Sequence, residues 1–182
     1  MALKSTIFKV SLNISDMDRH YYAEHALTLA RHPSENDQRM MVRLLAFALF
    51  ADEHLEFGRG ISSDDEPALW STDYSGVIQR WIDVGLPDER WLRKAAGRAN
   101  SVVLLTYGGR AAEVWWGKEG AALSKIRNLT VLSVSDDECA AMAALAERSM
   151  ALQCTIQDGQ VWLTDGTETV MIEPKTLLGA TA

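Results

Sequence analysis

The sequence predicts an α/β (α+β) fold in which a mixed β-sheet carries flanking helices and additional β-hairpins. Three observations support this class. A strand, a helix and a second strand follow one another in residues 77–107, which is the order of a parallel crossover unit. Two Asp-Gly pairs, at residues 158–159 and 165–166, separate short alternating runs near the C-terminus. The N-terminal segment, residues 5–31, largely alternates between apolar and polar side chains, as half-buried strands do.

The central crossover unit is predicted from residue types and turn signals. Residues 77–84, VIQRWIDV, are dense in β-branched and aromatic side chains over a length that suits one buried strand. Gly85 permits a sharp change of direction, and a proline followed by two acids favours a helix over residues 87–98. Residues 102–107, VVLLTY, then predict a second buried strand. We therefore expect a right-handed connection between the two strands.

The N-terminal elements precede this unit. Residues 5–14 and residues 21–31 predict two strands that pair as a hairpin. Ser34 and Asp37 resemble a capping box with the shorter acid, and strong helix formers follow, so a helix is expected over residues 35–52.

The remaining segments follow the same rules. Glycines within residues 53–70 indicate a bulge or a close backbone approach. A helix is expected over residues 111–120, a strand over residues 129–134, and a helix capped by Ser135 after it. Three short strands complete the chain, at residues 150–157, 160–164 and 169–173.

Composition restricts the class of protein. A chain of 182 residues suffices for one substantial core, so one domain is expected. No apolar run is long enough to cross a bilayer and the start lacks a signal peptide, so no membrane association and a cytoplasmic location are expected. The net charge of -7 argues against nonspecific coating of nucleic acid but is compatible with a local basic groove. Cys139 and Cys154 show neither disulfide nor metal spacing.

Acidic residues at two places suggest a metal site. Asp83 ends the central strand, which is where open α/β sheets usually place their chemistry. Asp65 and Glu66 lie in the DDEP segment just before that strand's predicted neighbour. Carboxylates that approach one another repel unless a cation lies between them, and hard oxygen ligands suit Mg²⁺ or Mn²⁺. Lys94, on the basic face of the next helix, could reach a scissile phosphate or a metal-bound water.

Each of these residues also has an ordinary structural interpretation. The DDEP segment could be a solvated turn, and the basic helix face an exposed surface. Asp83 could be a strand-end carboxylate that accepts backbone hydrogen bonds or pairs with an arginine. No tight ligand spacing involves the histidines, and neither a GxGxxG motif nor a P-loop is present, so a zinc site, a dinucleotide enzyme and an NTPase are disfavoured.

Five sequence blocks, taken together, resemble the YaeQ family of bacterial proteins. They are LTLARHPSE, RLLAFALFADE, DDEPALW, WIDVGLPDERWLRKA and RAAEVWW. The resemblance runs along nearly the whole chain, so it implies one domain over residues 1–182 with a nuclease-like core at about residues 34–134. The implied fold is a variation of the PD-(D/E)XK nuclease fold, with extra strands added to a mixed sheet.

The nuclease pattern can be transferred residue by residue. Asp83 matches the second acid, and Glu66 or Asp65 is the candidate for the first. The lysine expected two residues after the second acid is replaced by Gly85, and the acid and proline stand in reverse order in Glu66-Pro67. Some nucleases of this superfamily move the lysine to the neighbouring helix, a part that Lys94 could play.

Two functions are therefore expected from the sequence. The first is a metal-dependent phosphodiesterase, in which Asp83, Glu66 and Lys94 are catalytic, Asp65, Glu66 and Asp83 are the candidate ligands of Mg²⁺ or Mn²⁺, and nucleic acid is the partner. The second is a non-catalytic interaction or regulatory module that keeps a degenerate nuclease fold and binds a protein partner.

Overall fold

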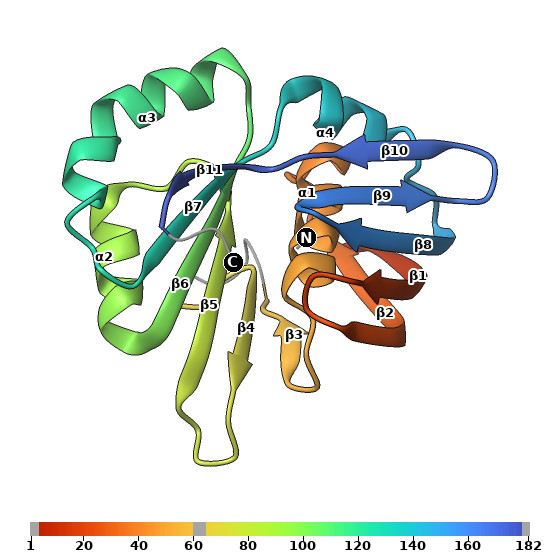
Figure 1. Cartoon of the computed structure of the whole chain (residues 1–182), viewed down its shortest axis with the longest axis horizontal. Coiled ribbons are helices and arrows are strands. Elements are labelled where there is room, and N and C mark those ends of the chain that lie inside the picture. The colour runs from red at the N-terminus through yellow and green to blue at the C-terminus, as the bar shows by residue number, and fades with distance from the viewer. Residues whose placement is uncertain (1–3, 60–64, 180–182) are drawn as a thin grey trace. The chain divides into compact units, whose positions relative to one another are not determined.

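The computed structural model describes residues 4–59 and 65–179, which divide into two compact units (Figure 1). The first unit contains the described residues up to Leu49 together with Asp137–Pro174, and the second contains Phe50–Asp136 with the described residues from Lys175 onward. The fold class is mixed α+β, as predicted, because each unit holds a mixed sheet.

The first unit contains a five-stranded sheet in the order β10-β9-β8-β1-β2. Its strands are β1 (Thr6–Asp16), β2 (Tyr21–Arg31), β8 (Ser149–Gln157), β9 (Gln160–Thr164) and β10 (Thr169–Ile172). The predicted N-terminal hairpin is confirmed, as are the three C-terminal strands. At the β8–β9 turn Asp158 and Gly159 both have positive φ, 54° and 75°, which is the backbone that an Asp-Gly hairpin turn requires. Strand β1 joins β8 in parallel, whereas the other neighbours are antiparallel.

Alternation along these strands separates a buried face from an exposed one. Phe8, Val10, Leu12 and Ile14 of β1 are buried, and the residues between them are exposed or half-buried. Helix α1 (Asp37–Phe50) packs against the buried face of β2, where the ring of Phe47 meets that of His25 edge-on with centroids 5.0 Å apart. Helix α4 (Asp136–Ala143) contributes buried side chains to the same unit.

The start of α1 differs from the prediction. Asn36 is the capping residue, because its Oδ1 accepts a hydrogen bond from the amide of Arg39 at 2.9 Å. The predicted capping box of Ser34 and Asp37 is wrong: the Ser34 hydroxyl bonds to the ring of His32 instead, and Asp37 pairs with Arg31.

The second unit contains a six-stranded sheet in the order β11-β7-β6-β5-β4-β3. Its strands are β3 (Leu55–Phe57), β4 (Leu69–Thr72), β5 (Ile78–Val84), β6 (Ala99–Thr106), β7 (Leu129–Ser133) and β11 (Lys175–Leu178). Strands β5, β6 and β7 are parallel, and they are connected by α2 (Glu89–Arg98) and α3 (Arg110–Leu123), which confirms the predicted strand-helix-strand unit. Side chains of both helices form one hydrophobic cluster with this sheet, so both cover the same face.

Strand β11 was not predicted. It pairs antiparallel with β7 at the edge of the sheet.

Among the described residues, no helix is both long enough and apolar enough to span a membrane.

Candidate functional site

Asp83 lies at the carboxyl end of β5, where the sequence placed it, and it is 8% exposed. Described residues donate three hydrogen bonds to its carboxylate. Oδ1 accepts one from the amide of Ala68 at 3.1 Å, and Oδ2 accepts one each from Nε1 of Trp81 and Nε1 of Trp91, both at 2.7 Å. Hydrogen bonds to an ionised acceptor are short and about twice as strong as neutral ones. Each oxygen of the carboxylate therefore accepts at least one N–H hydrogen bond.

The local sequence explains why two indoles converge on one acid. Trp81 lies two residues before Asp83 on β5, so both side chains leave the same face of the strand. Trp91 lies in the first turn of α2, where Asp88 caps the helix by accepting a hydrogen bond from the Trp91 amide at 2.9 Å. The cap fixes the start of α2, and with it the position from which the second indole reaches Asp83.

Three indoles form a tryptophan cluster, namely Trp70, Trp81 and Trp91, and the last two donate to Asp83. Trp70 and Trp81 are register partners on β4 and β5, and their rings meet at 86° with centroids 6.1 Å apart. Trp81 and Trp91 meet at 62° with centroids 5.7 Å apart. The guanidinium of Arg98 lies over the Trp81 ring, 5.0 Å from its centroid. Edge-to-face aromatic pairs and a cation over an indole are both favourable arrangements.

The third donor, the amide of Ala68, is held in place by Gly58. The Gly58 amide donates to the Ala68 carbonyl at 2.9 Å, which continues the pairing of β3 with β4. A Cβ atom on Gly58 would lie 2.1 Å from the carbonyl oxygen of Pro67, so this position accepts only glycine without a shift of backbone. The predicted close backbone approach in residues 53–70 is confirmed here.

The acids of the DDEP segment have other partners. Glu66 accepts a hydrogen bond from the Arg59 amide at 2.9 Å and pairs with Arg59 Nε at 3.1 Å. Asp65 Oδ1 lies 3.9 Å from Lys94 Nζ, and both side chains are exposed. Arg98 donates to the Asp65 carbonyl at 3.2 Å. The structure thus brings Lys94 to Asp65, whereas Asp83 and Glu66 bond to different groups among the residues that the structure describes. Asp64 lies outside these residues.

This arrangement bears on the expected metal. Within residues 4–59 and 65–179 no three side chains of His, Cys, Asp or Glu are grouped so that they could hold a metal ion. Both oxygens of Asp83 face N–H donors, and a cation bound there would lie against the positive ends of those dipoles. As placed, Asp83 fits a hydrogen-bond acceptor better than it fits a ligand of Mg²⁺ or Mn²⁺. The assignment of Asp65, Glu66 and Asp83 as metal ligands stays a prediction.

The sequence interpretation did not identify the two indole partners of Asp83. From the sequence, Trp81 is expected only as one of the aromatic residues of a buried strand, and Trp91 only as part of a helix. The usable signal was the spacing: a tryptophan two residues before an acid shares its face on a strand, and an indole N–H in an apolar environment needs an acceptor.

Comparisons with known proteins agree over most of the chain. The family described as YaeQ protein matches residues 1–174. The protein named Uncharacterized protein YaeQ from Escherichia coli (strain K12) is 49% identical over 165 residues, covering 91% of each chain. Its namesake from Salmonella typhi is 47% identical over 173 residues, covering 95% of this chain and 96% of the relative.

Two crystal structures are also similar. That of the YaeQ protein from Xanthomonas axonopodis pv. citri has a TM-score of 0.94 and 49% identity, and covers 97% of this chain and 99% of that one. That of the YaeQ protein from Pseudomonas syringae has a TM-score of 0.92 and 38% identity, and covers 97% of both chains. Given the match over residues 1–174 and these identities, the chain belongs to the YaeQ family.

Proposed function

We propose that this protein is a non-catalytic interaction module, in which a nuclease-like architecture serves as a scaffold and Asp83 anchors the tryptophan cluster. The observation that supports this most is the set of partners of Asp83, which are two indole N–H groups at 2.7 Å and one backbone amide at 3.1 Å. In this proposal the second unit is a variation of the PD-(D/E)XK fold in which Asp83 has a structural role.

The chemistry around Asp83 favours this role. A catalytic Mg²⁺ usually keeps several waters, which it needs for attack on a phosphate. The rings of Trp81 and Trp91 instead place apolar surface beside the carboxylate and direct their N–H groups at one oxygen. The position where the nuclease pattern has its lysine is Gly85, which has no side chain and a φ of 110°. These contacts support a structural role for Asp83 that requires no cation.

The expected contact surface is the exposed side of α2. Arg90, Lys94 and Arg98 are exposed on this helix, and the guanidinium of Arg98 lies over the Trp81 ring of the tryptophan cluster. Cationic side chains on a rigid helix suit a protein partner with an acidic segment, because complementary charge accelerates encounter and suppresses wrong partners. We propose that α2 carries this contact.

A metal-dependent phosphodiesterase is the second candidate, and one observation favours it. Lys94 Nζ lies 3.9 Å from Asp65 Oδ1, so the predicted helix lysine does reach the DDEP segment. In this alternative Asp83, with Glu66 or Asp65, would hold Mg²⁺ or Mn²⁺, and Lys94 would stabilise negative charge on a phosphate of nucleic acid.

Calorimetric titration with Mg²⁺ and with Mn²⁺ separates the two candidates. Wild type is compared with Asp83→Asn and with Asp65→Asn, and each protein is then incubated with single-stranded and double-stranded DNA and RNA. The module predicts no binding that depends on Asp83 and no metal-dependent cleavage. Saturable binding and cleavage that disappear in Asp83→Asn, while that variant stays folded, would establish the phosphodiesterase instead.

A further inference from the structure

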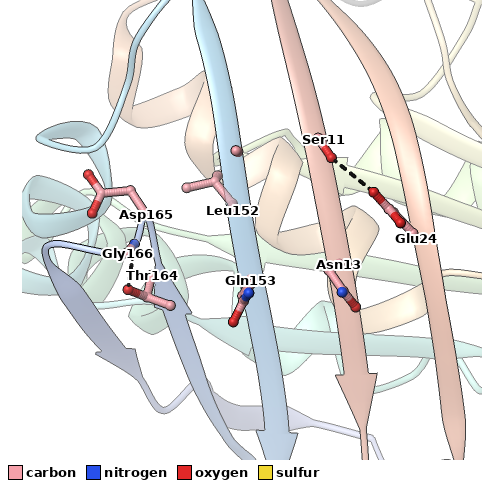
Figure 2. Close-up of a pocket in the computed structure, with 9 residues that line it drawn as sticks. Ser11, Asn13, Glu24, Leu152, Gln153, Thr164, Asp165 and Gly166 are labelled. Atoms are coloured by element: carbon pink, nitrogen blue, oxygen red, sulfur yellow. Dashed lines mark hydrogen bonds between the residues drawn. The ribbon is translucent and has the colours of Figure 1, made fainter.

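The exposed face of the sheet in the first unit carries rows of polar side chains that the proposed function does not use. Side chains of register partners stand next to one another on a sheet face. One row crosses all five strands through successive partners, in the order Glu24, Asn13, Gln153, Thr164 and Thr169. Because Asn13 and Gln153 are direct partners on parallel β1 and β8, their two carboxamides stand side by side (Figure 2).

The neighbouring row is made of small residues, which leaves room above the sheet. Ser11 of β1 is the partner of Ala26 on β2 and of Ala151 on β8. A groove of about 330 Å³ lies along these two rows, and Asp165 and Gly166 of the β9–β10 turn also line it (Figure 2). This volume is at the lower end of the range for small-molecule sites, which is roughly 300–1,000 Å³.

The two carboxamides at the centre of the groove are available to a ligand. Neighbouring polar groups are used within the protein: Ser11 Oγ donates to Glu24 at 3.4 Å, and Thr164 Oγ1 donates to the Glu168 carbonyl at 2.8 Å. In the described part of the chain, by contrast, the side chains of Asn13 and Gln153 form no hydrogen bond. Each carboxamide offers two donors and one acceptor oxygen, so the pair presents both kinds of group in one plane of the sheet.

Aromatic side chains lie in the next row on the same face. Tyr22, Ser15, Thr155, Trp162 and Met171 are successive partners there, and rows on one face are about 7 Å apart. Tyr22 is 61% exposed and Met171 is 46% exposed, whereas Trp162 is half-buried. Ser15 and Thr155 lie between the two rings in this row, which borders the groove without lining it. Ring faces next to carboxamides suit a ligand with an apolar face and a polar rim.

The charges at the groove exclude one class of ligand. The nine lining residues include two acids, Glu24 and Asp165, and no lysine or arginine. Hydrogen bonds from the amides of Glu168 and Thr167 lower the pKa of Asp165, so this carboxylate is ionised at neutral pH. Phosphates and other polyanions need cationic partners, which this groove lacks.

We infer that this groove binds a neutral oligosaccharide. A sugar ring has C–H groups on its faces and hydroxyl groups around its rim. Asn13 and Gln153 hydrogen-bond to the hydroxyls, and the rings of Tyr22 and Trp162 contact the apolar faces. This inference is independent of the role of Asp83, which belongs to the other unit.

Titration of the ¹⁵N-labelled protein with maltohexaose, cellohexaose and chitotetraose, followed by NMR, tests the inference. Side-chain amide resonances of Asn13 and Gln153 report on the groove directly, and loss of each in the matching alanine variant assigns it. We expect at least one sugar to shift both resonances in a saturable way, with a dissociation constant of roughly 1 mM or tighter. Asn13→Ala and Gln153→Ala each weaken binding about tenfold, because each removes hydrogen bonds to the ligand.

Two kinds of control separate loss of binding from loss of folding. Both side chains are exposed and form no hydrogen bond with other described residues, so the alanine variants fold with unchanged stability. Gln157→Ala, an exposed glutamine further along β8 and outside the lining, leaves binding unchanged. Absence of saturable shifts with all three sugars overturns the inference, as does binding that survives in both alanine variants. Stronger binding of a single-stranded oligothymidylate at these resonances overturns it as well.

Discussion

Replacement of Asp83 by asparagine tests the structural role of this acid through stability. The substitution keeps the size of the side chain but leaves only one oxygen for three donors. If that oxygen faces the two indoles, the new NH₂ group faces the Ala68 amide, and the opposite orientation directs it at Trp81 and Trp91. Either orientation leaves at least one buried donor unpaired and removes the charge from the hydrogen bonds that remain.

The expected loss follows from these contacts. An unpaired buried donor costs about 1–3 kcal/mol, and a hydrogen bond to a charged acceptor contributes about 1.5–3 kcal/mol against about 1 kcal/mol for a neutral one. We therefore expect Asp83→Asn to lower the free energy of unfolding by about 2–4 kcal/mol. Trp91→Phe removes one donor and keeps most of the ring, so its expected cost is about 1–2 kcal/mol. The two changes share one hydrogen bond, and the double variant should cost less than their sum.

Urea denaturation followed by tryptophan fluorescence measures the unfolding of the second unit, which contains Asp83. Of the six tryptophans, all except Trp162 lie in the second unit with Asp83. Asp65→Asn is the matched control, because the Asp65 side chain is 84% exposed and a surface change of this kind alters stability by about 0.5 kcal/mol at most. An unchanged urea midpoint in Asp83→Asn would refute the structural role. That is the result expected for a metal ligand in a site without metal, because such a carboxylate does not contribute to stability.

Three further predictions concern other parts of the chain. Gly58→Ala places a Cβ atom only 2.1 Å from the Pro67 carbonyl oxygen, so we expect it to lower the free energy of unfolding, measured by urea denaturation and fluorescence, by about 2 kcal/mol. Gly97→Ala, which has open space around its Cβ, leaves this free energy unchanged. Burial lowers the pKa of His25 below its ordinary value of 6.5, so below about pH 6.5 the unfolded chain binds more protons at this residue than the folded chain does. Unfolding followed by circular dichroism should therefore show that stability falls as the pH drops below about 6.5, and that it falls less steeply in His25→Asn. Burial, aided by the charge of Asp16, raises the pKa of Cys154 to about 12, so mass spectrometry should find it alkylated by iodoacetamide only after denaturation; alkylation of the native protein at the denatured rate would contradict this.

Most of the secondary structure was predictable from local signals. Alternation predicted the β1–β2 hairpin, and the Asp158-Gly159 pair predicted the β8–β9 turn, because each pattern depends on neighbouring residues. The crossover from β5 through α2 to β6 followed from one strand run, one helix start and a second strand run. The position of Asp83 at the end of β5 came with that unit.

Features that depend on distant parts of the chain were not predictable. Strand β11 has four residues and finds its partner β7 more than forty positions earlier, so local alternation carries no signal for it. The row that joins Asn13 to Gln153 exists because β1 pairs in parallel with β8, and nothing near either residue specifies that register. The partners of Asp83 come from β5, α2 and the residue before β4, and their convergence is a property of the folded sheet.

Paramagnetic broadening of indole resonances by Mn²⁺ tests the central claim about Asp83 most directly. The Nε1 atoms of Trp81 and Trp91 lie 2.7 Å from Asp83 Oδ2, so a manganese ion bound there would broaden both signals before that of Trp115, whose Nε1 donates to the Pro87 carbonyl oxygen instead. The structural role predicts that all the indole signals stay equally sharp at low Mn²⁺, and that Asp83→Asn shifts the signals of Trp81 and Trp91. Selective, saturable broadening of these two signals that disappears in Asp83→Asn would contradict the account and place a metal ion at this acid.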